Sequence, residues 1–167
     1  MTNLREEHVT RKLAICLVSK KYEIISVHPP DGQGPFVIPV DSVESRIERG
    51  SIHPDLVAID VDKFGKKWLT IAECKLLESD LEDDVEKFKI LAGNRRYLLY
   101  AFFRCQSFLG GPNLGFNYSE ISRMKTEDFP LKFMLAASAD ASKVVQVENI
   151  GSFKCHKYLF SSRDLRL

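Results

Sequence analysis

The stretch from residue 52 to 75, IHPDLVAIDVDKFGKKWLTIAECK, constrains the fold of this chain more than any other. It holds two short apolar runs on either side of a glycine-containing turn, a pattern that predicts a β-hairpin. Asp55 opens the first run, and Glu73 and Lys75 close the second. An apolar hairpin with three charges of mixed sign at one end forms either a solvated ion pair or a functional site.

The register of the hairpin decides whether these charges meet. If Val61 lies opposite Lys67, then Asp55 faces Glu73 on the same side of the sheet, about 5 Å apart at Cβ. Two opposed carboxylates beside a core repel each other, and burying them is costly unless a cation compensates. A hard dication such as Mg²⁺ does so, since it prefers oxygen ligands. The other interpretation is an Asp55–Lys75 ion pair at a sheet margin, with Glu73 in solvent.

Length and composition predict one domain over residues 1–167. The chain is 44 % hydrophobic with a formal charge of +1, which is typical of a soluble globular protein. Its first residues lack the apolar run of a signal peptide, and no stretch reaches the roughly 18 apolar residues of a membrane span. We therefore expect a cytoplasmic protein without a membrane partner. Because the net charge is nearly neutral, a nucleic-acid partner requires a local basic patch.

Hydrophobic periodicity predicts the order helix, strand, strand, strand, helix, strand over residues 3–103. The segments are a helix ending near Lys20, a strand over 22–27, the hairpin, a helix over 79–93 and a continuous apolar strand, RYLLYAFF, over 96–103. Residues 104–167 are expected to form a C-terminal extension that packs on this core. The acidic run at the start of the second helix is interpreted as a complement to the positive helix N-terminus and is left out of the site; its members are Asp80, Glu82, Asp83 and Asp84.

Pro54-Asp55 followed by Glu73-Cys74-Lys75 resembles the signature of the PD-(D/E)xK nuclease superfamily, also called restriction-endonuclease-like. In that family a Pro-Asp pair opens one strand of a hairpin and Glu-x-Lys lies on the next. The family core also has the element order expected here. The resemblance implies an α/β fold with a mixed central sheet flanked by helices. The helix after Glu-x-Lys has no glutamine, so no branch of the superfamily is assigned.

The resemblance also implies the chemistry of the site. Asp55 and Glu73 are expected to hold Mg²⁺, for which Mn²⁺ substitutes, with the backbone carbonyl of Cys74 as a further ligand. Lys75 is expected to orient or help deprotonate the attacking water. Many members add an acid from the first helix, and Glu6 is the candidate because it shares a helical stripe with apolar residues. A capping and dipole role for Glu6 remains open.

The expected function is that of a Mg²⁺-dependent endonuclease that hydrolyses DNA phosphodiester bonds, of the restriction, repair or junction-resolving type. A single catalytic domain cuts both strands most easily as a two-fold homodimer. Two alternatives stay open: a catalytically inactive nucleic-acid-binding or assembly module on the same fold, and an RNA-directed nuclease. Aromatic residues in loop-like segments are candidates either for base stacking or for the core; they are Phe36, Phe108, Phe116 and Tyr118.

Overall fold

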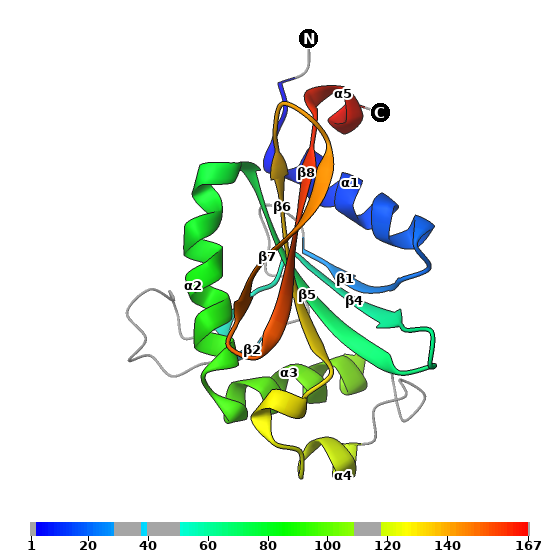
Figure 1. The fold of residues 1–167 in the computed structure, drawn as a ribbon, viewed down its shortest axis with the longest axis vertical. Helices are drawn as coiled ribbons and strands as arrows, with labels where there is room; N and C mark the ends of the chain where they lie inside the picture. Colours follow the sequence, from blue (N-terminus) through cyan, green and yellow to red (C-terminus); the bar gives the residue numbers. More distant parts are fainter. Residues whose placement is uncertain (1–2, 29–37, 40–50, 109–117, 167) are drawn as a thin grey trace.

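A computed structural model describes residues 3–28, 38–39, 51–108 and 118–166 of the chain (Figure 1). The helices in these parts are α1 (Glu6–Ser19), α2 (Leu81–Ala92), α3 (Arg95–Phe108), α4 (Tyr118–Ile121) and α5 (Ser162–Leu165), with the 3₁₀ helices η2 (Glu78–Asp80) and η4 (Thr126–Asp128). The strands are β1 (Glu23–Val27), β2 (Ile38–Pro39), β3 (Ser51–Ile52), β4 (Leu56–Val61), β5 (Lys67–Leu77), β6 (Leu131–Ser138), β7 (Lys143–Ile150) and β8 (Phe153–Phe160). Within these described ranges, no helix has the length and apolarity needed to cross a membrane.

The centre of the fold is an open, mixed six-stranded sheet in the order β1-β4-β5-β6-β8-β7. The pairs β5–β6 and β6–β8 are parallel, and the other neighbours are antiparallel. The central strands β5 and β6 are buried over most of their length, as expected for strands covered on both faces. Strands β2 and β3 form a separate small sheet. The predicted α/β class with a mixed central sheet flanked by helices is thus confirmed.

Helices cover the two faces of the sheet, with α1 on one side and α2 on the other (Figure 1). Helix α1 buries Val9, Leu13 and Leu17 completely, at the helical spacing that places them on one stripe. Helix α2 packs Phe88 against Phe133 of β6, with stacked rings whose centroids are 4.4 Å apart. The sheet is therefore the middle layer, and its central strand β5 contributes to both cores.

The strand predicted over residues 96–103 is wrong, because this segment lies within helix α3. Its buried side chains follow a helical pattern: Tyr97, Leu98, Ala101, Phe102 and Cys105. Tyr100 and Phe103 are exposed aromatic residues between these buried positions, and they make the apolar run continuous in the sequence. Asn94 caps the helix, because its Oδ1 accepts a hydrogen bond of 3.0 Å from the backbone N–H of Arg96.

Residues 104–167, expected as an extension, supply half of the central sheet. Strand β6 follows the helical segments and pairs in parallel with β5, so it is the next strand of the sheet in place of the one expected at 96–103. Strands β7 and β8 extend the sheet beyond β6. The earlier elements agree with expectation, since α1 ends at Ser19 and β1 spans Glu23–Val27.

Candidate functional site

The hairpin of β4 and β5 has the predicted register, with Val61 paired to Lys67 and Val57 paired to Ile71. Its turn is held by Asp62, whose Oδ1 accepts hydrogen bonds of 2.9 Å from the backbone N–H groups of Phe64 and Lys66. Asp and Gly are typical of such turns because of local side-chain hydrogen bonding and backbone freedom. Two residues beyond the Val57–Ile71 pair, this register brings Asp55 next to Glu73.

Asp55 and Glu73 come together at the end of the hairpin. The Oδ2 of Asp55 accepts a hydrogen bond of 2.7 Å from the backbone N–H of Cys74, the residue between Glu73 and Lys75. Glu73 is almost fully buried, with 1 % of its surface exposed. Burial, then the neighbouring charge of Asp55 and a hydrogen bond with Asp55, raise the pKa of Glu73 well above its ordinary value, against the lowering effect of Lys87.

Lys75 forms ion pairs with side chains of both helices that flank the sheet. Its Nζ lies 3.9 Å from Oε2 of Glu6 on α1 and 3.9 Å from Oδ2 of Asp84 on α2. Burial raises the pKa of Glu6; the positive charge of Lys75 opposes this rise, and the charges of Asp55 and Asp84 add to it. Glu6 therefore lies beside Lys75 at the edge of the cluster. Because Glu6 is also in the first turn of α1, a favourable interaction with the helix dipole accompanies this position.

Two residues of α2, Asp84 and Lys87, belong to the same cluster and were missed by the sequence analysis. The Nζ of Lys87 lies 3.4 Å from Oδ1 of Asp84 and 4.0 Å from Oε1 of Glu73. The Asp84 side chain is fully buried, so leaving the whole acidic run out of the site is wrong for this member. Asp84 follows Leu81 by three residues and precedes Phe88 by four, the spacing of the buried stripe, and this was the available signal.

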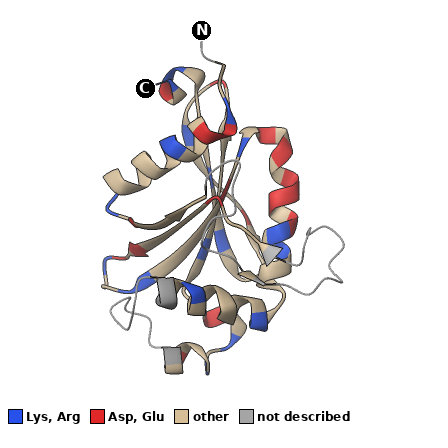
Figure 2. Ribbon diagram, turned by 180° about the vertical axis from the view of Figure 1, so that it is seen from behind, with Lys and Arg blue, Asp and Glu red and all other residues tan. Residues whose placement is uncertain are grey.

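The other acids of that run, Asp80, Glu82 and Asp83, are exposed at the start of α2, where Figure 2 shows a run of red ribbon. Their interpretation as complements of the helix N-terminus agrees with this position. Of the candidates for base stacking, Phe36 and Phe116 and the side chains of Phe108 and Tyr118 lie outside the described residues.

The donor atoms of the cluster are those that a hard dication prefers. In the described part of the chain, no three His, Cys, Asp or Glu side chains are arranged to hold a metal ion together. The predicted set has the carboxylates of Asp55, Glu73 and Glu6 and the carbonyl of Cys74, and its three carboxylates are not arranged as such a group. Glu6 pairs with Lys75 instead, which leaves Asp55, Glu73 and the Cys74 carbonyl as candidate ligands. Oε1 of Glu73 and both oxygens of Asp84 are buried without a hydrogen-bond partner among the described atoms. The unpartnered Oε1 of Glu73, beside Asp55, fits a ligand of Mg²⁺ or Mn²⁺, while Lys87 supplies part of the compensating charge.

Fold and cluster together define an α/β protein in which a hairpin of the central sheet delivers buried acids and a lysine to one place, between two flanking helices. Comparisons with models of known families, with curated proteins and with solved structures find no match for this chain. The restriction-endonuclease-like family therefore stays a prediction that depends on the Pro-Asp and Glu-x-Lys residues and their geometry.

Proposed function

We propose that the chain is a Mg²⁺-dependent endonuclease that hydrolyses phosphodiester bonds of DNA. The proposal depends on one observation: the carboxylates of Asp55 and Glu73 adjoin at the end of one hairpin, with Lys75 two residues further along β5. A restriction-endonuclease-like core is proposed with it, made of α1, β1, β4, β5, α2 and β6. The strand at its end is β6 rather than the segment expected from the sequence.

Each side chain then has a defined task. Asp55 and Glu73 hold the ion together with the Cys74 carbonyl, and the hydrogen bond from Cys74 N–H to Asp55 fixes the first carboxylate relative to the second. Mg²⁺, when bound, polarises the scissile phosphate and stabilises charge on the leaving oxygen. Lys75 directs its ammonium at the attacking water or a phosphate oxygen. Its ion pairs with Glu6 and Asp84 restrict where that ammonium lies.

DNA is the proposed substrate, and cleavage of both strands is proposed to need a two-fold homodimer. One chain carries one cluster of this kind among its described residues, so one chain presents one cutting centre. A symmetric pair of chains presents two centres related by the same two-fold axis that relates the strands of a palindromic or branched duplex.

The charge balance of the cluster favours a second candidate function. Lys87 approaches both Asp84 and Glu73, so part of the negative charge is already neutralised without a metal. A cluster balanced in this way also suits a catalytically inactive nucleic-acid-binding or assembly module. An RNA-directed nuclease uses the same phosphate chemistry, so RNA belongs in the same assay.

A cleavage assay separates these functions. Supercoiled DNA, branched DNA and single-stranded RNA are incubated with the protein in Mg²⁺, in Mn²⁺ and in chelator, beside the variants Asp55→Ala and Lys75→Ala. Lys89→Ala is the matched control, since this exposed lysine pairs with Glu86 elsewhere on α2. Metal-dependent cleavage of DNA that both site variants lose and the control retains supports the proposal. Binding without cleavage under every condition contradicts it and supports the module.

A further inference from the structure

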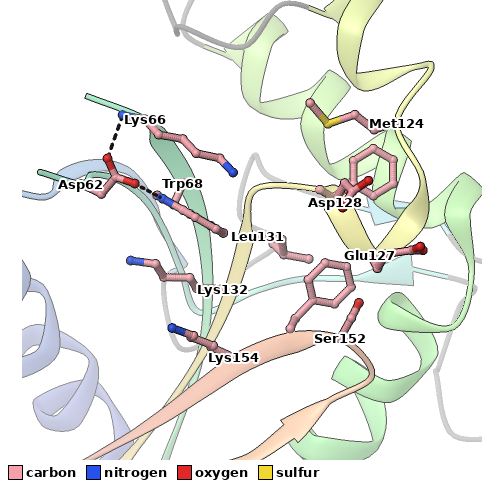
Figure 3. Close-up of a pocket in the computed structure, with 12 residues that line it drawn as sticks. Asp62, Lys66, Trp68, Met124, Glu127, Asp128, Leu131, Lys132, Ser152 and Lys154 are labelled. Atoms are coloured by element: carbon pink, nitrogen blue, oxygen red, sulfur yellow. Dashed lines mark hydrogen bonds between the residues drawn. The ribbon is translucent and has the colours of Figure 1, made fainter. Parts of the chain in front are cut away.

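A second concave site lies near the start of β5, at the end of the strand opposite to the acid cluster. It is a cavity of about 610 Å³, within the size range of small-molecule and nucleotide sites. The hairpin, η4 and the first residues of β6 and β8 line it (Figure 3). Its chemistry is an aromatic platform, three lysines and three acids: Trp68, Lys66, Lys132, Lys154, Asp62, Glu127 and Asp128.

Trp68 is held in a fixed orientation at this cavity. Its indole Nε1–H donates a hydrogen bond of 3.1 Å to Oδ2 of Asp62, the residue that also organises the hairpin turn. The ammonium of Lys66 lies 4.3 Å from the ring centroid and that of Lys132 lies 5.4 Å from it. A partly exposed indole with ammonium groups beside it suits a flat base whose attached phosphate carries negative charge.

The two sides of the cavity carry opposite charge. In Figure 3, Lys66, Lys132 and Lys154 lie on the side of the sheet, and Glu127 and Asp128 lie across the cavity on η4. Lys132 forms an ion pair of 2.6 Å with Asp60 of β4, which neutralises one of the three cations.

A positive field nevertheless remains on the lysine side of the cavity. Burial lowers the pKa of His156 on β8, and the charges of Lys132, Lys154 and Lys20 lower it further. The three lysines have two carboxylates beside them, Asp60 and Asp62, so one net positive charge remains on this side. The lysine side therefore attracts anions, whereas the acids across the cavity favour hydrogen-bond donors.

A nucleotide has three features that match this cavity. Its flat base suits the indole, the amino or imino donors of the base suit the acids, and its anionic phosphate suits the lysines. We propose that the cavity binds one nucleotide of a single-stranded nucleic acid, with its base stacked on Trp68 and its phosphates along Lys66, Lys132 and Lys154. The exposed Lys66 side chain leaves the ring when the base arrives and turns to the phosphate. The donors of the base face Glu127 and Asp128.

This inference goes beyond the endonuclease proposal and does not depend on it, because the cavity and the acid cluster share no residue. A strand rather than a free nucleotide is the proposed occupant, since the lysines extend from the hairpin across β6 to β8 and can follow a backbone of several phosphates. Neighbouring phosphates then add binding that one nucleotide cannot supply.

The test uses the fact that Trp68 is the only tryptophan of the chain, so its fluorescence reports on this cavity alone. Wild-type protein in chelator, where metal-dependent cleavage is prevented, is titrated with oligo(dC) and separately with CMP. Quenching by oligo(dC), with CMP at least about 10-fold weaker, supports the proposal. Absence of quenching, or equal affinity for CMP and oligo(dC), overturns it.

Variants test the contacts by anisotropy of a labelled oligo(dC), which does not need the tryptophan. Trp68→Ala should weaken binding about 10-fold or more, and Lys66→Ala and Lys154→Ala should each reduce the slope of log affinity against log salt by about 0.7. Lys89→Ala on α2 should bind like the wild type. Unchanged affinity and salt slope in both lysine variants overturn the proposal even if Trp68→Ala fails to fold.

The outcomes also separate this inference from the endonuclease proposal. Protein that cleaves DNA but shows no quenching overturns the strand site alone. Protein that shows quenching but never cleaves overturns the endonuclease proposal and leaves the strand site supported.

Discussion

The Oδ2 of Asp55 lies 2.7 Å from the backbone nitrogen of Cys74, so the residue that opens β4 is tied to the residue between Glu73 and Lys75. In Asp55→Asn the amide oxygen can still accept this bond, and a negative charge beside Glu73 disappears. We expect the urea midpoint of unfolding of Asp55→Asn to equal or exceed that of the wild type. Its rate of DNA cleavage should fall by about 100-fold or more.

Asp55→Ala is the matched comparison, because it removes both the charge and the acceptor. The backbone N–H of Cys74 then loses its partner, and the free energy of unfolding should fall by about 1–3 kcal/mol. Urea unfolding of the two variants measures the difference. An equal loss of stability in both would show that the charge of Asp55, rather than its hydrogen bond, stabilises the hairpin end.

Burial of Glu73 predicts a pH dependence of stability. Its pKa in the folded protein is raised well above the ordinary 4.5, chiefly by burial. Between these two pKa values the folded state binds more protons than the unfolded state, so stability falls as pH rises through the window, by at most about 1.4 kcal/mol per pH unit for one group. Glu73→Gln should remove this slope in chelator and be the more stable protein at alkaline pH.

Urea unfolding of wild type and Glu73→Gln across the acid-to-neutral range measures the slope as a difference. Glu6 and Asp84 also have raised pKa values and are present in both proteins, so their contributions largely cancel. Parallel curves for the two proteins would contradict a buried Glu73.

The hairpin and its acid end could be predicted from the sequence, because side-chain alternation and a short turn leave few registers. Once Val61 pairs with Lys67, the neighbourhood of Asp55 and Glu73 follows from a period of two. Glu6 could be placed in the same way, since the stripe that buries Val9 is set by helical periodicity. Local rules thus predict the hairpin register and the face of α1 that carries Glu6, whereas the contact of Glu6 with Lys75 depends on how α1 packs on the sheet.

The rest depended on tertiary structure. Helix α3 was read as a strand because exposed Tyr100 and Phe103 hide the helical period of its buried residues. The sequence indicates a surface acid at Asp84 because its partner Lys75 comes from a strand that the helix meets only after folding. Strand β6 pairs with β5 at a separation of some sixty residues, for which periodicity carries no signal.

Gly65 in the hairpin turn has a φ of +80°, a backbone conformation that L-residues with a Cβ adopt at a cost. Gly65→Ala should therefore lower the free energy of unfolding by about 1–2 kcal/mol, although an added Cβ meets no atom within 4 Å. Lys63→Ala, an exposed change in the same turn, should stay within about 0.5 kcal/mol of the wild type. Urea unfolding measures both, and equal stability of the two variants would contradict the turn geometry.

Asp84 should affect cleavage through Lys75 rather than through the ion. In Asp84→Asn the ammonium of Lys75 loses one of its two carboxylate partners and keeps Glu6. We expect cleavage to fall by about 10- to 100-fold through kcat, with DNA affinity in chelator unchanged. Asp84→Glu, which keeps the charge, should recover part of the loss. Weaker DNA binding with an unchanged kcat would instead assign Asp84 to substrate contact.

Lys87 offers the sharpest distinction between an ion-paired module and a metal site. Lys87→Met removes the ammonium that lies 3.4 Å from Asp84 and 4.0 Å from Glu73, so buried carboxylates lose their compensation. In chelator we expect the free energy of unfolding to fall by about 2 kcal/mol. This is less than for a fully buried ion pair, because the Lys87 side chain is one-third exposed. Mg²⁺ at about 100 times its Kd should raise the free energy of unfolding of this variant by about 2.7 kcal/mol, because the ion binds only the folded state.

Thermal and urea unfolding of Lys87→Met, with and without Mg²⁺, measure this recovery beside Lys89→Met, whose exposed side chain lies away from the cluster. If Mg²⁺ restores the stability of Lys87→Met but not that of the double variant Lys87→Met/Asp55→Asn, the ion binds at the predicted carboxylates. If Mg²⁺ leaves the stability of Lys87→Met unchanged, the lysines are the cluster's permanent counter-charge, and the inactive module becomes the better description of this protein.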